Sequence, residues 1–110
     1  MTPLFKVFMP NNIHSKLKKT IKTGYLSEGI KSKIFQKKVT KFIGNNKVTL
    51  TNSCTSALTM AYKIIDVNNA EVISTPLTCV AANVPLLHQG AKIVWSDIDQ
   101  ETGMVTADNI

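Results

Sequence analysis

Short strand-like runs alternate with apolar helical segments in the second half of this chain, and this alternation most constrains the fold. Residues 47–51, 71–75 and 92–96 have the β-branched and apolar composition of strands. Helices are expected after the first two runs, over about 55–66 and about 79–89. Alternating elements of this kind form βαβ units, in which the strands are parallel and helices cover both faces of the sheet. The sequence therefore predicts an α/β fold.

Two further helices are expected before the first strand. Asn11 or Asn12 can cap the first of them, and Gly24 offers a left-handed end. The second is expected over about 30–43, with Ser27 as a candidate cap. The first part of the chain is therefore predicted to be helical.

The predicted sheet is too small to complete a domain. Three short parallel strands leave exposed edges and little shared core. Residues 97–103 form a polar turn after the third strand, and residues 104–110 resemble the start of another helix. The sequence therefore predicts the N-terminal fragment of a longer protein, with a helical segment at residues 1–46 and the beginning of an incomplete α/β domain at residues 47–110.

The N-terminal part of the chain carries the excess of positive charge. Residues 1–47 hold 11 lysines and one acidic residue, whereas residues 48–110 hold 2 lysines and 6 acidic residues. The lysines alternate with apolar positions in the manner of a solvated helix face. Arginine, which supplies bidentate contacts with phosphates and guanine, is absent from the sequence. These features favour solvated helices over a lysine-rich module that binds nucleic acid or membranes, which remains an alternative.

The sequence favours a cytoplasmic location. The longest uncharged run, residues 72–91, contains two prolines and several polar residues, so it does not resemble a membrane span. Cys54 and Cys79 form neither a CxxC pair nor a disulfide framework, which favours a reducing compartment. No membrane partner is expected.

Two segments at strand ends are candidates for ligand binding, because ligands of open α/β sheets bind beyond the carboxyl ends of the strands. Residues 52–56 lead into a helix and offer amides and hydroxyls suited to a phosphate, although spacing alone favours a plain helix N-cap. Residues 75–80 place Cys79 near a helix start, where a thiol can act as a nucleophile. The preferred interpretation of Cys79 is a small apolar residue that lines the site, because no histidine partner is identifiable.

The motifs that the sequence lacks narrow the choice of ligand. It contains no GxGxxG, GxxxxGK[ST], GxSxG or HExxH motif, and no metal-ligand spacing. A phosphate site without the glycine-rich dinucleotide fingerprint points away from NAD-binding folds. It indicates a cofactor held by a single phosphate, of which pyridoxal 5'-phosphate (PLP) is an example.

Four blocks of sequence, in their order and spacing, resemble the N-terminal part of the DegT-type (DegT/DnrJ/StrS) sugar aminotransferases, which are PLP-dependent. The blocks are residues 24–29, 51–58, 71–83 and 90–99. The resemblance implies the three-layer PLP-transferase fold of aspartate aminotransferase (fold type I), of which the chain holds only the N-terminal part of the large domain. It also implies a homodimer.

The resemblance implies roles for particular residues. Thr55 and Ser56 would bind the phosphate of PLP through backbone amides and hydroxyl groups. Cys79 stands where such enzymes usually carry an aromatic residue stacked on the pyridine ring, and a thiol covers less of that ring. Tyr25 would lie near the substrate and the dimer interface, where it either contacts the sugar or nucleotide or simply packs in the interface.

The implied reaction moves an amino group, from glutamate, to a keto group of a nucleotide-linked sugar, for synthesis of an amino sugar of a surface polysaccharide. No catalytic residue is assigned within the chain, because the Schiff-base lysine and its partner aspartate match segments beyond Ile110. Lys63 is expected in a helix and Lys92 at a strand start, so neither fits the position of the Schiff-base lysine. The 110-residue chain alone is therefore expected to be inactive. Some relatives replace the lysine, so a PLP-dependent sugar dehydratase is the alternative.

Overall fold

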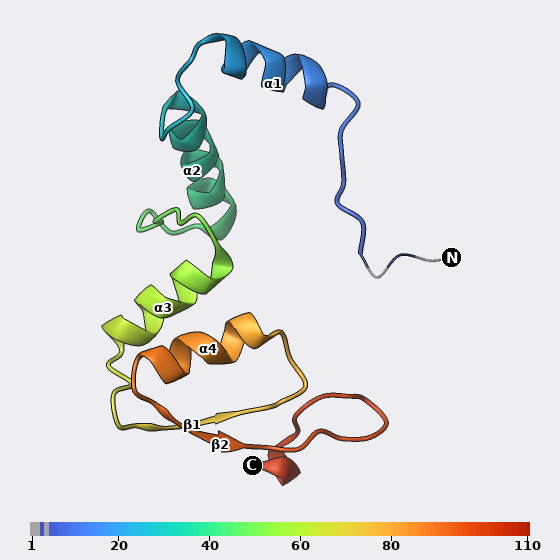
Figure 1. Ribbon diagram of the computed structural model, residues 1–110, viewed down its shortest axis with the longest axis vertical. Coiled ribbons are helices and arrows are strands. Elements are labelled where there is room, and N and C mark those ends of the chain that lie inside the picture. The colour runs from blue at the N-terminus through green and yellow to red at the C-terminus, as the bar shows by residue number, and fades with distance from the viewer. Residues whose placement is uncertain (1–2, 4) are drawn as a thin grey trace. The chain divides into compact units, whose positions relative to one another are not determined.

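A computed structural model describes residue 3 and residues 5–110 (Figure 1). Residues 1, 2 and 4 of the predicted N-terminal segment lie outside the described residues. The chain divides into two compact units, Met1–Thr49 and Leu50–Ile110. The first unit is helical, and the second combines helices with a small sheet.

The first unit contains the two predicted helices, α1 (Ile13–Lys22) and α2 (Ile30–Ile43). Both have apolar positions at helical spacing, with lysines between them. Gly44 ends α2 in the left-handed conformation, with φ of 73°, and its amide donates to the C=O of Thr40. The predicted positions of both helices are confirmed.

Gly24 has the predicted left-handed conformation after α1, with φ of 69°, but the predicted side-chain caps at the N-termini of the two helices are not formed. Asn12 precedes α1 but makes no side-chain cap hydrogen bond, because its ψ of 9° is far from the extended backbone of a capping residue. Gly29, and not Ser27, is the N-cap of α2. Ser27 lies too far before the first helical turn to reach its amides. The sequence offered the right residue types, but the backbone conformation decides whether they cap.

The second unit is built around a βαβ unit (Figure 1). Strand β1 pairs in parallel with β2, with Glu71 opposite Lys92 and Ser74 opposite Trp95. Helix α4 connects the two strands, and α3 precedes them. The elements are α3 (Cys54–Ile64), β1 (Glu71–Ser74), α4 (Val80–His88), β2 (Lys92–Trp95) and the short 3-10 helix η1 (Ala107–Asn109). The predicted parallel arrangement of these strands is confirmed.

Residues 47–51 form no strand, so this prediction is wrong. Their composition suits a strand, but a strand is stabilised by hydrogen bonds to a neighbouring strand. Within the described part of the chain, β1 and β2 pair only with each other. The Gln36 side chain instead donates a hydrogen bond to the C=O of Val48. The sheet therefore has two strands where the sequence predicted three.

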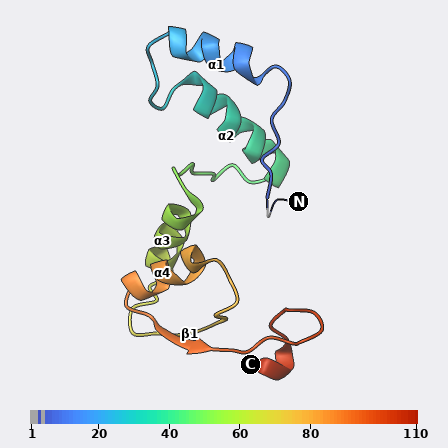
Figure 2. The same cartoon turned by 45° about the vertical axis from the view of Figure 1, so that its right-hand side comes forward.

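The core of the second unit is small. Val67, Leu86 and Ala91 form its buried hydrophobic cluster, and Pro85 of α4 is fully buried as well. Helix α3 packs against α4, and α4 lies on the sheet, so three elements share this core (Figure 2). The half-buried side chains that pack around it are Tyr62, Val72 and Ile93. Because the core is small, a substitution that removes apolar atoms from one of its side chains is expected to lower the stability of the unit.

Gly90 permits the sharp turn from α4 into β2. Its φ is 78°, and its C=O accepts a hydrogen bond from the amide of Asn69. A Cβ at this position would overlap Oδ1 of Asn68, whereas a Cβ at Gly103, with φ of 68°, would meet nothing within 4 Å. Left-handed backbone costs a residue with a Cβ about 1–2 kcal/mol at either site.

We expect Gly90→Ala to lower the midpoint of thermal unfolding of the full-length protein more than Gly103→Ala does. Both variants have the backbone cost, but only Gly90→Ala must also displace Asn68. Thermal unfolding followed by circular dichroism measures both variants beside the wild type. Equal shifts, or a larger shift for Gly103→Ala, would contradict the steric role of Asn68.

Candidate functional site

The candidate site lies in the second unit, at the carboxyl ends of the two strands. Parallel pairing places the ends of β1 and β2 at the same edge of the sheet. Five residues separate the end of β1 from the start of α4, and α3 lies beside α4 with its N-terminal end pointing the same way (Figures 1 and 2). Two helix N-termini therefore face the region in which α/β folds bind ligands.

The N-terminus of α3 is capped by Ser53. This residue has extended backbone, with φ of −158° and ψ of 159°, and its hydroxyl accepts a hydrogen bond from the amide of Ser56 over 3.0 Å. The hydroxyl of Ser56 in turn donates to Oδ1 of Asn52 over 2.7 Å. The helix N-cap that the sequence allowed is therefore present.

This cap leaves donors free for a phosphate. Among the described residues, the amides of Cys54 and Thr55 and the hydroxyl of Thr55 have no hydrogen-bond partner. Thr55 is half-buried and is the second residue of α3. Free amides and the helix dipole attract anions at such a position. The residues present thus fit a phosphate group, with Thr55 better placed than Ser56, whose hydroxyl already bonds Asn52.

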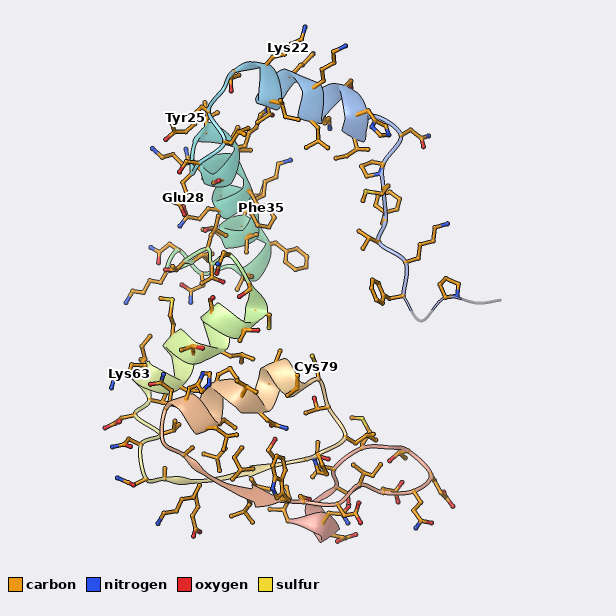
Figure 3. All side chains as sticks on the ribbon, in the orientation of Figure 1. Lys22, Tyr25, Glu28, Phe35, Lys63 and Cys79 are labelled. Atoms are coloured by element: carbon orange, nitrogen blue, oxygen red, sulfur yellow. The ribbon has the colours of Figure 1, made fainter. Side chains whose placement is uncertain are left out.

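Cys79 is the N-cap of α4. Its side chain makes no cap hydrogen bond, its thiol is free, and it is exposed (Figure 3). His88 is the last residue of the same helix, so the structure places it at the opposite end from Cys79. The chain therefore gives this thiol no nearby histidine from α4, and it leaves the sulfur open to a ligand at the strand ends.

Asn83 is a site residue that the sequence analysis did not single out. It lies in the second turn of α4 and is buried. Its side-chain amide bonds two consecutive residues at the end of β1, accepting from the hydroxyl of Ser74 over 2.6 Å and donating to the C=O of Thr75 over 3.1 Å. An asparagine inside an otherwise apolar helical run is the signal that could have indicated it.

The loop after β2 is ordered by its own side chains. The carboxylate of Asp99 accepts hydrogen bonds from the hydroxyl and the amide of Thr102, each over 2.8 Å, and from the amide of Glu101 over 3.2 Å. The Thr102 hydroxyl, followed by its amide, holds the pKa of Asp99 below the usual value, because these donors favour the charged form. This loop carries a carboxylate that stays ionised near neutral pH.

Tyr25 belongs to the first unit. It lies in the loop before α2, and its ring packs on Gly29, where a Cβ would come within 2.9 Å of Cε1 (Figure 3). The ring is exposed and borders a hollow of about 530 Å³ between α1 and α2. The other residues that line this hollow are Lys19, Thr20, Thr23, Leu26, Ser27, Gly29, Ile30, Lys31 and Ser32. The hollow beside Tyr25 is therefore lined by hydroxyl groups and by lysines.

Two other features are absent from the described residues. Within residue 3 and residues 5–110, no group of three or more histidine, cysteine, aspartate or glutamate side chains is placed to hold a metal ion. None of the helices described is both long and apolar enough to cross a membrane.

The chain belongs to the DegT/DnrJ/EryC1/StrS aminotransferase family, whose sequence profile matches residues 9–110. This finding confirms the resemblance seen in the four sequence blocks. The family is PLP-dependent. The chain is therefore part of a member of a PLP-dependent family.

Two curated relatives illustrate the similarity. The spore coat polysaccharide biosynthesis protein SpsC of Bacillus subtilis is 38% identical over 84 residues, which are 76% of this chain and 22% of SpsC. The UDP-4-amino-4,6-dideoxy-N-acetyl-beta-L-altrosamine transaminase of Campylobacter jejuni is 34% identical over 85 residues, 77% of this chain and 23% of that protein. The chain thus spans about a quarter of the length of these relatives.

Two solved structures are similar over nearly the whole chain. AtS13 from Actinomadura melliaura has a TM-score of 0.86 at 33% identity, and the match covers 99% of this chain and 30% of AtS13. The sugar aminotransferase CalS13 from Micromonospora echinospora has a TM-score of 0.81 at 30% identity, with the same coverage. The chain corresponds to the N-terminal part of these proteins.

We expect Ser53→Ala to lower the free energy of unfolding by about 1 kcal/mol, because it removes the side-chain cap of α3. Thr55→Val is the matched control, since the Thr55 hydroxyl has no partner among the described residues, and its effect is expected to stay within about 0.5 kcal/mol. Denaturant unfolding of the ligand-free full-length protein measures both. A larger loss for Thr55→Val would show that its hydroxyl has a structural partner.

Proposed function

We propose that the full-length protein containing this chain is a PLP-dependent aminotransferase that moves an amino group from glutamate to a keto group of a nucleotide-linked sugar. The observation that carries the proposal is the family match over residues 9–110, combined with free anion-binding donors at the start of α3. The names of two similar proteins support the substrate class, since one is a UDP-sugar transaminase and another a sugar aminotransferase.

In this proposal, the start of α3 binds the cofactor phosphate. The amides of Cys54 and Thr55 and the hydroxyl of Thr55 donate to phosphate oxygens, and the dipole of an 11-residue helix stabilises the negative charge. The Ser56 hydroxyl joins them by exchanging Asn52 for the phosphate. When bound, PLP supplies the carbonyl group that accepts the amino group and the ring that takes up electrons.

Cys79 lies beside the cofactor ring in this proposal. It is exposed at the N-cap of α4, with no other use for its thiol among the described residues. A thiol buries less area than an aromatic side chain and makes no stacking contact, so the ring is held less by this position than in enzymes with an aromatic residue there. The phosphate contacts at α3 then carry a larger share of cofactor binding.

The two parts of the chain have different roles in the proposal. Residues 1–46 form an N-terminal helical segment, where Tyr25 contacts the sugar nucleotide or packs at the interface of a homodimer. Residues 47–110 begin the PLP-binding domain of a three-layer, type I fold. The remainder of the full-length protein supplies the Schiff-base lysine and the aspartate that pairs with the ring nitrogen. The 110-residue chain alone is therefore inactive.

The biological setting follows the relatives. SpsC is named for spore coat polysaccharide biosynthesis, which supports synthesis of an amino sugar for a surface polysaccharide. We place the enzyme in the cytoplasm, because the free Cys54 and Cys79 favour a reducing compartment. The residue at the lysine position of the full-length sequence separates this aminotransferase from a sugar dehydratase of the same fold, because only a lysine can form the Schiff base.

We expect the purified full-length protein to carry an absorbance band at the edge of the visible range that borohydride abolishes. Thr55→Val is expected to weaken PLP binding by at least about tenfold, because a hydrogen bond to a charged group contributes about 1.5–3 kcal/mol. Thr59→Val is the matched control: its hydroxyl donates to the C=O of Thr55, one turn further along α3. Spectroscopic titration with PLP measures all three proteins.

Two outcomes would contradict the proposal. A full-length protein that binds no PLP would exclude the cofactor and the reaction class together. Equal PLP affinity in the wild type and Thr55→Val, or an equal loss of affinity in Thr55→Val and Thr59→Val, would exclude the Thr55 hydroxyl as a phosphate ligand.

A further inference from the structure

Asn83 and Ser96 are the two buried polar side chains of the described residues, with 8% and 4% of their surfaces exposed. Both lie where the strands end, Asn83 on α4 and Ser96 directly after β2. Burying a polar group is costly unless it is hydrogen-bonded, and both are. Their partners differ, and the difference separates their roles.

Asn83 ties α4 to the end of β1 in one defined orientation. The C=O of Thr75 can only accept a hydrogen bond, so the Nδ2 of Asn83 must face it. Its Oδ1 is then left to accept from the hydroxyl of Ser74. The side-chain amide therefore forms a hydrogen bond through both Oδ1 and Nδ2. Exchanging the positions of these two atoms would lose the bond to the C=O of Thr75.

These two bonds close the turn that carries Cys79. The turn leaves β1 at Thr75 and enters α4 at Val80, and Asn83 joins its beginning to the second turn of the helix. Within the turn, the Thr75 hydroxyl accepts a hydrogen bond from the amide of Leu77 over 3.2 Å. The position of Cys79 is thus set by a closed loop of bonds.

Ser96 makes different contacts at the same edge. Its amide donates to the C=O of Ser74, and its hydroxyl donates to the C=O of Asn109 over 2.8 Å. These bonds join β2 to β1 and to η1, and none of them touches residues 75–79. Ser96 is therefore a matched control: a buried, hydrogen-bonded polar residue of the same unit that stabilises the fold without holding the turn.

We propose that Asn83 is a positioning residue for the cofactor: its amide fixes residues 75–79 and so sets where Cys79 stands against the ring of bound PLP. The inference rests on the proposed function. Asn83 itself does not touch the cofactor and acts through the turn. A solely structural residue would change stability alone, whereas a positioning residue also changes the orientation of the ring.

The test compares Asn83→Ala, Ser74→Ala and Ser96→Ala in the full-length protein, with PLP as the probe. Ser74→Ala removes one of the two bonds and keeps Asn83, so it serves if Asn83→Ala fails to fold. The measurements are the dissociation constant of PLP, the circular dichroism of the bound cofactor in its visible band, and the midpoint of thermal unfolding.

We expect Asn83→Ala and Ser74→Ala to weaken PLP binding at least threefold and to change the visible circular dichroism of the bound cofactor. Ser96→Ala is expected to lower the unfolding midpoint while it leaves both cofactor signals unchanged. On a Cys79→Ala background, Asn83→Ala is expected to change the cofactor signals less, because residues that act through one another are not additive.

Unchanged cofactor signals in both Asn83→Ala and Ser74→Ala, or the same changes in Ser96→Ala, would overturn the positioning role while leaving the proposed function intact. Full additivity with Cys79→Ala would overturn the route through the turn. A wild-type protein that binds no PLP would overturn the proposed function itself, and with it the role of Asn83.

Discussion

Parallel pairing of β1 with β2 is the interaction on which the second unit depends. Parallel neighbours cannot be joined by a tight turn, so the chain must cross back through α4. This crossover brings Leu86 of α4 onto the small core and places the N-terminus of the helix at the carboxyl ends of the strands. Asn83 then ties that end of the helix to β1. The location of the candidate site therefore follows from the strand pairing.

Phosphate attraction in the proposed site is local and does not depend on the overall charge. The net charge of +6 comes from the 11 lysines of residues 1–47, most of which lie in α1 and α2, whereas the residues after position 47 hold 2 lysines and 6 acidic residues. The donors offered to the phosphate are helix amides and the hydroxyl of Thr55, which act over short distances and are weakly screened by salt. A mildly acidic region can thus hold an anionic cofactor.

The sequence predicted the elements that local patterns define. The helices and both paired strands have apolar spacing and end signals within their own segments, so they were predicted nearly to their ends. The strand predicted over residues 47–51 is wrong because a strand needs a neighbouring strand to pair with, and composition does not reveal whether one is present. Neither Asn12 nor Ser27 caps its helix through its side chain, because the backbone conformation decides which residue can cap. Asn83 was missed because its partners, eight and nine residues earlier, are visible only after folding.

A crystal structure of the full-length protein grown with PLP tests the central claim most directly. The proposed site predicts that phosphate oxygens lie about 3 Å from the Thr55 hydroxyl and from amides of the first turn of α3, with Cys79 beside the ring. A cofactor phosphate bound at any other segment would contradict the claim that the start of α3 holds the phosphate of PLP.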